Sequence, residues 1–143
     1  MTTPSASPPA KPLPQISPEM APFFAAARRH ELVVQRCGTC HTMRFPARAV
    51  CSRCLGRESE WVPVSGRGEV FSVAVMHQAN HPGFAAEVPY AVVVVALEEG
   101  VRMLSNVVDC PVREVRIGLP VEVTFDDVTP EVTLPKFRPR RGA

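Results

Sequence analysis

Hydrophobic and polar residues alternate along the second half of the chain, as they do in β-strands with one buried face. Residues 69–77 follow this alternation from end to end. Residues 90–97 are almost continuously apolar and β-branched, which is typical of a strand buried on both faces. After a turn signal at residues 98–100, residues 101–108 are predicted to return as the partner strand of a hairpin.

Further apolar segments complete a small barrel. Residues 121–125 alternate again, and residues 132–134 are the candidate for a last strand. Five short strands separated by turn signals, within residues 61–135, therefore predict a small β-barrel. We interpret Gly66 and Gly68 as a tight bend into the first of these strands, because a phosphate-binding loop would be longer and would open a helix.

A short helix is predicted ahead of the strands, over residues 17–31. Ser17 is a suitable N-cap and Pro18 suits the first helical position. Phe23 and Phe24 are adjacent, so they cannot both lie on one narrow apolar stripe. One of the two rings is therefore expected to face outward, toward the rest of the chain or toward a partner.

The length and composition fit one domain with small attachments. The chain has 143 residues, of which 45% are hydrophobic, so a packed core is possible. The first segment is rich in proline and has almost no large apolar side chain, so we expect it to be a flexible tail. The predicted segments are a tail (1–16), a helix (17–31), a cysteine-rich segment (32–60), a barrel (61–135) and a basic C-terminal tail (136–143).

Four of the five cysteines form two Cys-x-x-Cys pairs separated by ten residues, which is the strongest chemical signal in the chain: Cys37, Cys40, Cys51 and Cys54. Four thiolates complete the tetrahedron around one zinc and leave no open position, so the predicted site is structural. Iron is the alternative ion, because the same sulfurs suit it. We expect Gly38 and Gly56 to supply the positive φ values of the two turns. Cys110 is interpreted as a small buried hydrophobe.

The charge distribution argues against binding to nucleic acid, which remains an alternative function. The formal net charge is +2, from 16 basic and 14 acidic residues. The barrel segment is acidic, whereas a groove that follows phosphates must be basic. Stacking platforms are also scarce, because Phe71 and Phe125 occupy positions that the pattern assigns to the core.

No apolar segment is long enough to span a bilayer, and the first ten residues lack the features of a secretory signal. Paired cysteines in a reducing compartment favour metal binding over disulfides. We therefore expect a cytoplasmic protein.

At this point the chain resembles the bacterial and archaeal family long called domain of unknown function 35. The resemblance extends over roughly residues 20–139 and rests on several short motifs: Phe23-Phe24, residues 32–36 leading into Cys37-x-x-Cys40, Phe45-Pro46-x-Arg48 before Cys51-x-x-Cys54, Trp61, residues 65–70, Pro89-Tyr90, residues 117–123 and residues 136–139. The family carries Trp in many members where this chain has Phe24. The resemblance implies a mainly β fold, with an N-terminal helix, a rubredoxin-like zinc ribbon and a C-terminal five-stranded OB-fold barrel.

The resemblance also implies a partner role in acyl-CoA chemistry. Proteins of this family form heteromeric complexes with thiolase-like enzymes, or with MaoC-like hydratases of the hot-dog fold. The partner supplies the catalytic groups, the ribbon docks the partner, and the barrel helps to hold the coenzyme A thioester. The resemblance thus implies a non-catalytic accessory subunit of a thiolase-type acyl-CoA enzyme, with a MaoC-like hydratase as the alternative partner.

Candidate contacts for the acyl-CoA or for the partner come from two places. The loop at residues 78–89 carries His81 and Phe84, and His77 precedes it at the end of a predicted strand. Arg44 and Arg48 lie between the cysteine pairs and could contact phosphates. The plainer interpretations are polar loop histidines, a phenylalanine that packs back on the barrel, and solvated arginines. A third hypothesis is an independent enzyme that uses His77 or His81 as a base.

Overall fold

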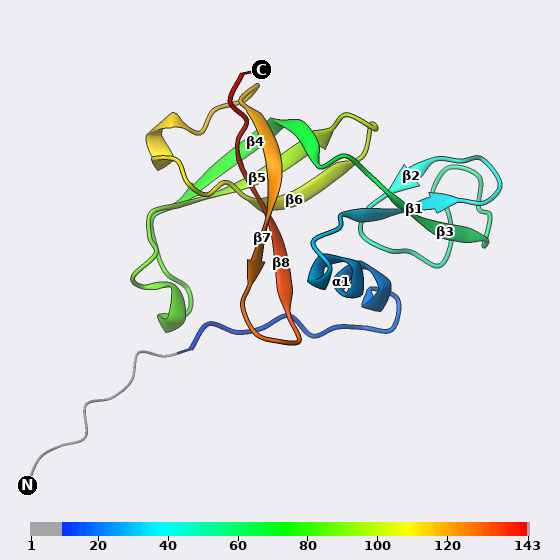
Figure 1. Ribbon diagram of the computed structural model, residues 1–143, viewed down its shortest axis with the longest axis horizontal. Helices are drawn as coiled ribbons and strands as arrows, with labels where there is room; N and C mark the ends of the chain where they lie inside the picture. Colours follow the sequence, from blue (N-terminus) through cyan, green and yellow to red (C-terminus); the bar gives the residue numbers. More distant parts are fainter. Residues whose placement is uncertain (1–9, 143) are drawn as a thin grey trace, which may run out of the picture.

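The computed structural model describes residues 10–142 and contains one α-helix and two antiparallel β-sheets within that range. The smaller sheet has the strand order β2-β1-β3, and the larger has the order β6-β5-β4-β7-β8 (Figure 1). The elements are α1 (Ala21–Arg28), β1 (Val33–Cys37), β2 (Met43–Arg44), β3 (Ser59–Pro63), β4 (Arg67–Met76), η1 (Pro82–Phe84), β5 (Tyr90–Leu97), β6 (Arg102–Asn106), η2 (Val112–Glu114), β7 (Pro120–Asp127) and β8 (Thr133–Pro139).

The larger sheet curls into a nearly closed five-stranded barrel. Its two end strands meet at a parallel bridge between Val107 and Phe137, where the Val108 N–H donates to the Phe137 carbonyl at 2.7 Å. The Phe137 side chain is fully buried at this closure and belongs to the core shared by the strands. The predicted barrel and the mainly β fold class are therefore confirmed, and the topology is that of an OB-fold.

A β-bulge in β4 corrects the expectation for Phe71. The pairing of β4 with β5 shifts register between Val70 and Ser72, so Phe71 is the extra residue and leaves the alternation. Its ring is 45% exposed, and the Arg102 guanidinium lies 3.8 Å from the ring centroid. Placing Phe71 in the core was wrong because a bulge inverts the inward and outward sides of a strand.

Strand β5 corrects a second expectation. Alternate residues of β5 are buried, whereas the residues between them, Tyr90, Val92, Val94 and Ala96, are only half-buried. The outer side of this strand is therefore apolar and has no layer over it within residues 10–142. The continuous apolar pattern of β5 predicts that both faces of the strand are buried, but the described residues bury only the inner face.

Helix α1 is shorter than the predicted residues 17–31. Met20, and not Ser17, is its N-cap, and Pro22 lies in the first turn. A helix starting at Pro18 would need an N–H at position 22 to bond to the Pro18 carbonyl, and proline has none. At the other end His30 adopts a φ of 59°, which leaves the helical region.

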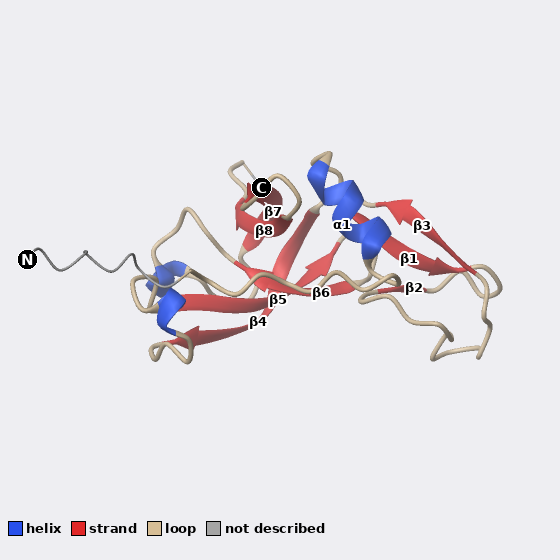
Figure 2. Cartoon of the chain, turned by 90° about the horizontal axis from the view of Figure 1, so that it is seen from below, coloured by secondary structure: helices blue, strands red, loops and turns tan. Residues whose placement is uncertain are grey.

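Helix α1 lies against both sheets, on β8 of the barrel and on β1 of the ribbon. Phe23 is buried, and its ring lies 5.2 Å from that of Phe24 and 5.0 Å from that of Phe45 in the ribbon. Phe24 is only half-buried and packs against the edge of the core, so the two rings do differ in burial. Figure 2 shows α1 beside the small sheet, at the junction with the barrel.

The terminal segments also differ from the predicted tails. Residues 1–9 lie outside the described range, and residues 10–20 run along one end of the barrel from η1 to α1 (Figures 1 and 2). At the other end, residues 136–139 belong to β8, where Val123 pairs with Phe137. The prediction of a tail from residue 136 was wrong. It rested on the basic residues of this segment, although Phe137 between them points into the core. None of the described helices is long and apolar enough to cross a bilayer.

Candidate metal centre

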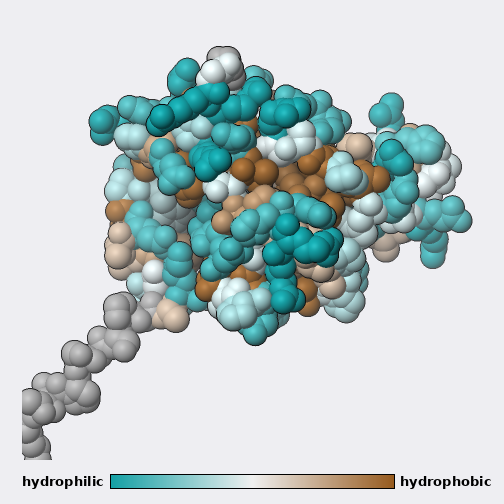
Figure 3. Space-filling view, viewed as in Figure 1, coloured by the Kyte–Doolittle hydropathy of each residue, from teal (hydrophilic) through white to brown (hydrophobic). Residues whose placement is uncertain are grey.

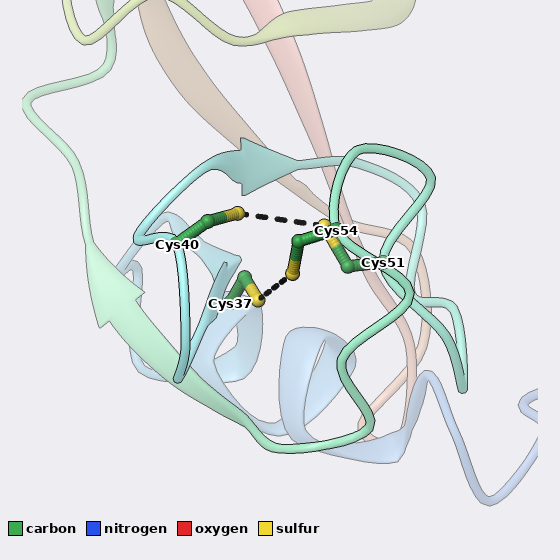
Figure 4. Close-up of side chains that lie close together, drawn as sticks. All are labelled: Cys37, Cys40, Cys51 and Cys54. Carbon is green, nitrogen blue, oxygen red and sulfur yellow. Dashed lines mark hydrogen bonds between the residues drawn. The ribbon is translucent and has the colours of Figure 1, made fainter.

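The four paired cysteines converge at one end of the small sheet (Figure 4). Cys37 ends β1 and Cys40 follows in the first turn, while Cys51 and Cys54 lie on a second turn before β3. The four Sγ atoms all lie within 4.8 Å of one another. The Cys37–Cys54 sulfurs are 3.5 Å apart and the Cys40–Cys51 sulfurs 3.7 Å apart. These separations are close to the ~3.8 Å edge of a tetrahedron with zinc–sulfur bonds of about 2.3 Å.

The two turns have the same backbone design. The His41 N–H donates to the Cys37 carbonyl at 3.1 Å, and the Leu55 N–H donates to the Cys51 carbonyl at 2.9 Å. His41 and Leu55 take the positive φ values, 61° and 64°. The expectation that Gly38 and Gly56 supply the positive φ values was wrong.

Gly38 and Gly56 instead lie where neighbouring segments pack closely. A Cβ at Gly38 would lie 3.0 Å from the Glu58 Cβ. At Gly56 it would lie 3.0 Å from the Thr39 hydroxyl oxygen and 3.2 Å from the Cys54 sulfur. Both glycines therefore let neighbouring chain segments approach the sulfur cluster.

Backbone N–H groups point at the sulfurs and favour thiolates. Those of Cys40 and Thr39 lower the pKa of Cys37 to about 6. At Cys54 the Gly56 N–H lowers the thiol pKa, but the neighbouring sulfurs, Cys37 first, and burial raise it to about 11. The pKa values of the thiols thus depend on their neighbours in the cluster, and a bound cation would favour the thiolate form of all four.

The donor set fits one zinc ion held by four thiolates. Because all four tetrahedral positions belong to the protein, the metal would stabilise the fold of the ribbon and would offer no site for a reacting water. Zinc binding here is expected to be coupled to folding, since the two cysteine turns have little other core of their own.

Of the other candidate residues, Arg44 and Arg48 both donate hydrogen bonds to one buried side-chain amide, that of Gln35. Arg44 Nε donates to the Gln35 side-chain oxygen at 2.8 Å, and the Arg48 backbone N–H donates to the same oxygen at 2.9 Å. Arg44 also donates to the Arg48 carbonyl at 2.9 Å. Arg44 is therefore largely committed to holding the ribbon together, while the Arg48 side chain is exposed.

The three candidates around the loop at residues 78–89 have separate environments. His77 lines an apolar cleft together with Val75 and Arg113. His81 caps η1, because its Nδ1 accepts the Gly83 N–H at 2.9 Å. Phe84 packs with its ring 5.6 Å from that of Tyr90, beneath the Lys11 ammonium at 5.6 Å.

Two groups of residues escaped the sequence-based interpretation. Lys11 pairs with Glu87 at 3.1 Å across 76 positions, and no local pattern signals such a contact. Gln35 is buried in β1, where Arg36 follows it directly, so the polar pattern of the strand does not single it out. Cys110 is half-buried, and burial, followed by the charge of Glu114, raises the pKa of its thiol.

Two family models match adjoining parts of the chain. Residues 24–60 match "ChsH2, rubredoxin-like zinc ribbon domain". Residues 61–126 match "ChsH2, C-terminal OB-fold domain". The two models together include the metal centre and four of the five barrel strands.

Curated and solved proteins show the same similarity. A DUF35 domain-containing scaffold protein of Methanocaldococcus jannaschii is 38% identical over 68% of this chain and 69% of its own length. A chain of the Ltp2-ChsH2(DUF35) aldolase superposes with a TM-score of 0.80 and 39% identity, covering 89% of this chain and 98% of that chain. A probable enoyl-CoA hydratase alpha subunit of Thermomonospora curvata is 40% identical over 90% of this chain, which spans only 40% of that longer protein.

Proposed function

Because the chain belongs to the DUF35 family of zinc ribbon and OB-fold proteins, we propose that it is a non-catalytic accessory subunit of an acyl-CoA enzyme. The observation that carries the proposal is the match to the aldolase-associated chain, which extends over 98% of that chain's length. In this role the protein assembles the complex and completes the acyl-CoA site, while the partner supplies the nucleophile and the bases.

The chemistry of the chain's own side chains supports a non-catalytic role. Cys37, Cys40, Cys51 and Cys54 would be the zinc ligands, so their thiolates are not available as nucleophiles. The raised pKa of Cys110 leaves its thiol protonated near neutral pH. These features also count against an independent enzyme based on His77 or His81, because no activated nucleophile accompanies either imidazole among residues 10–142.

The proposed partner is an enzyme that makes or breaks a carbon–carbon bond, of the thiolase or aldolase type. The aldolase-associated relative supports this choice, since the match covers 98% of its chain and 89% of this one. An enoyl-CoA hydratase partner is the second candidate, favoured by the hydratase alpha subunit, in which the similar region is a minority of the chain.

We further propose that the exposed candidates face the shared acyl-CoA. His77 is the best placed, because its cleft has apolar walls and Arg113 at the rim. Arg48 is free to meet phosphate, whereas Arg44, His81 and Phe84 would act mainly by holding their loops in place. These are positioning roles in the complex.

Purification of the tagged full-length chain from its native host tests the proposal. We expect an acyl-CoA enzyme subunit to be recovered with it, identified by mass spectrometry, and we expect acyl-CoA turnover only when both subunits are present. Recovery of the chain as a lone monomer, or thioester turnover by the chain alone, would contradict the proposal. Salt-sensitive retention of the pure chain on single-stranded DNA near 0.15 M salt would favour the nucleic-acid alternative.

A further inference from the structure

An apolar groove lies where the helix, the ribbon and the barrel meet. It has a volume of about 200 Å³. Its walls come from all three parts of the fold: Phe23 and Phe24 of α1, Phe45 of the ribbon, Met103 and Leu104 of β6, and Leu134 of β8. Figure 3 shows hydrophobic residues gathered over β6 and toward the ribbon, bordered by hydrophilic residues.

The polar groups at this groove already have partners within the chain. Lys136 Nζ lies 2.8 Å from an Asp126 carboxylate oxygen, and its side chain is only 17% exposed. The Ser105 hydroxyl donates to the Pro135 carbonyl at 2.9 Å, and the Asn106 amide donates to the Ala91 carbonyl at 2.9 Å. The groove therefore presents a largely apolar surface, and its one charged side chain, Lys136, is already paired.

One large apolar side chain projects beside the groove. Leu104 is 66% exposed although it lies in the middle of β6. It pairs across the sheet with Val94, whose outward side chain is only half-buried, as is that of Val92 on the same strand. The groove thus continues into the uncovered outer side of β5, and the two form one apolar surface.

We propose that this surface, the groove together with Leu104 and the outer side of β5, is where the acyl-CoA enzyme subunit docks, with an apolar side chain of the partner seated in the groove. The inference rests on the proposed function. The cores of protein interfaces are poor in charge and rich in aromatic residues and methionine, and the walls of this groove have that composition. The surface is also complementary in charge to an uncharged protein surface, since its one lysine is neutralised.

Other occupants suit the groove less well. Coenzyme A carries phosphates, which need a free cation, and Lys136 is already paired with Asp126. The described N-terminal segment does not cover it, because residues 10–16 run past η1 at the other side of the barrel (Figure 1). A second copy of the chain would have to insert an exposed apolar side chain of its own into the groove, and Leu104 is such a side chain. The test therefore includes the oligomeric state.

The test compares two exposed apolar residues on different parts of the barrel. Leu104→Asp places a charge in the proposed interface, and Ile117→Asp places the same charge at a residue that is 70% exposed in the loop before β7. Each tagged full-length variant is expressed in the native host, and the yield of the mass-spectrometrically identified acyl-CoA enzyme subunit is measured. We expect Leu104→Asp to lower that yield at least tenfold and Ile117→Asp to leave it within twofold.

Circular dichroism and zinc content check that both variants fold. A photocrosslinking amino acid at position 104, but not one at position 117, is expected to join the chain covalently to the enzyme subunit. If Leu104→Asp retains the partner as well as the unaltered chain does, or if both variants lose it equally, the docking surface is wrong while the accessory function stands. If the unaltered chain recovers no acyl-CoA enzyme, the proposed function fails as well.

Two further outcomes would assign the groove to another occupant and overturn the inference. One is a dimer of the pure chain, seen by light scattering, that Leu104→Asp dissociates. The other is binding of a fatty acyl-CoA to the pure chain that Leu104→Asp abolishes and Ile117→Asp does not.

Discussion

His30 Nε2 lies 3.0 Å from both carboxylate oxygens of Asp127, across 97 positions of the chain. The imidazole also stacks on Phe125, with ring centroids 5.0 Å apart and an interplanar angle of 9°. Thr133 donates its hydroxyl to Asp127 at 2.7 Å. His30 follows α1, and Asp127 ends β7, so this contact fastens the helix to the barrel hairpin whose second strand, β8, forms part of the groove.

Asp127→Asn is expected to weaken this attachment in a pH-dependent way. The Thr133 hydroxyl, followed by His30, lowers the pKa of the Asp127 carboxyl below its ordinary value of 3.8. A lowered carboxyl pKa stabilises the fold fully above that ordinary value, and the contribution is lost as the pH falls through the lower, folded-state pKa. Urea unfolding at a series of pH values measures this, and the variant should have a flatter stability profile below pH 4.

Glu131→Gln is the control, because Glu131 is exposed in the turn that joins β7 and β8 and forms no ion pair among the described residues. Its acid profile should match that of the unaltered chain. If Asp127→Asn leaves the acid limb of the profile unchanged, the contact between His30 and Asp127 contributes nothing to stability.

Cys51→Ser should abolish zinc binding and loosen the ribbon before the barrel. Elemental analysis is expected to give one zinc per unaltered chain and less than a tenth of that in the variant. Hydrogen exchange should rise throughout residues 32–60, while β5 stays protected, because it is hydrogen-bonded on both sides by barrel strands, β4 and β6. Cys110→Ser removes a thiol outside the cluster and should retain the zinc. Full zinc content in Cys51→Ser would exclude it as a ligand.

Phe137→Ala should be among the most destabilising single substitutions in the barrel. The ring is fully buried at the closure between β6 and β8, so its removal leaves a cavity and is expected to cost about 3–5 kcal/mol. Chemical denaturation monitored by the fluorescence of Trp61 gives the free energy of unfolding. Ile117→Ala, at an exposed site, should change it by about 0.5 kcal/mol or less. Equal effects of the two substitutions would mean that the barrel is not closed at Phe137.

Gly83→Ala should detach the N-terminal segment from η1. A Cβ at Gly83 would lie 2.8 Å from the Lys11 Cα and 2.9 Å from the Ala10 carbonyl oxygen, so residues 10–16 would have to move. Amide NMR shifts of these residues should move toward random-coil values. Glu87→Gln, which removes only the ion pair with Lys11, should have a smaller effect. Unchanged shifts in Gly83→Ala would show that the segment does not rest on this loop in solution.

Much of this fold could be predicted because its signals are local. The Cys-x-x-Cys spacing, the alternation in β7 and the hairpin of β5 and β6 each lie within a short stretch of chain. The failures have long-range causes. The bulge at Phe71 depends on how β4 pairs with β5, and the extension of β8 to Pro139 depends on Val123 and its neighbours in β7. The predicted start of α1 was wrong for a local reason. Ser17 is a suitable N-cap, but Pro22 lacks the N–H that a helix starting at Pro18 would need.

The amino-acid sequence alone was enough to predict a four-cysteine candidate metal centre and a small barrel, because ligand spacing and strand periodicity are properties of neighbouring residues. The tertiary structure alone decided which side chains are free to act. It committed Arg44, His81 and Phe84 to internal contacts, and it left Leu104 uncovered beside a groove built from three separate segments. Whether a side chain is exposed depends on which residues pack against it, and those residues come from distant parts of the chain.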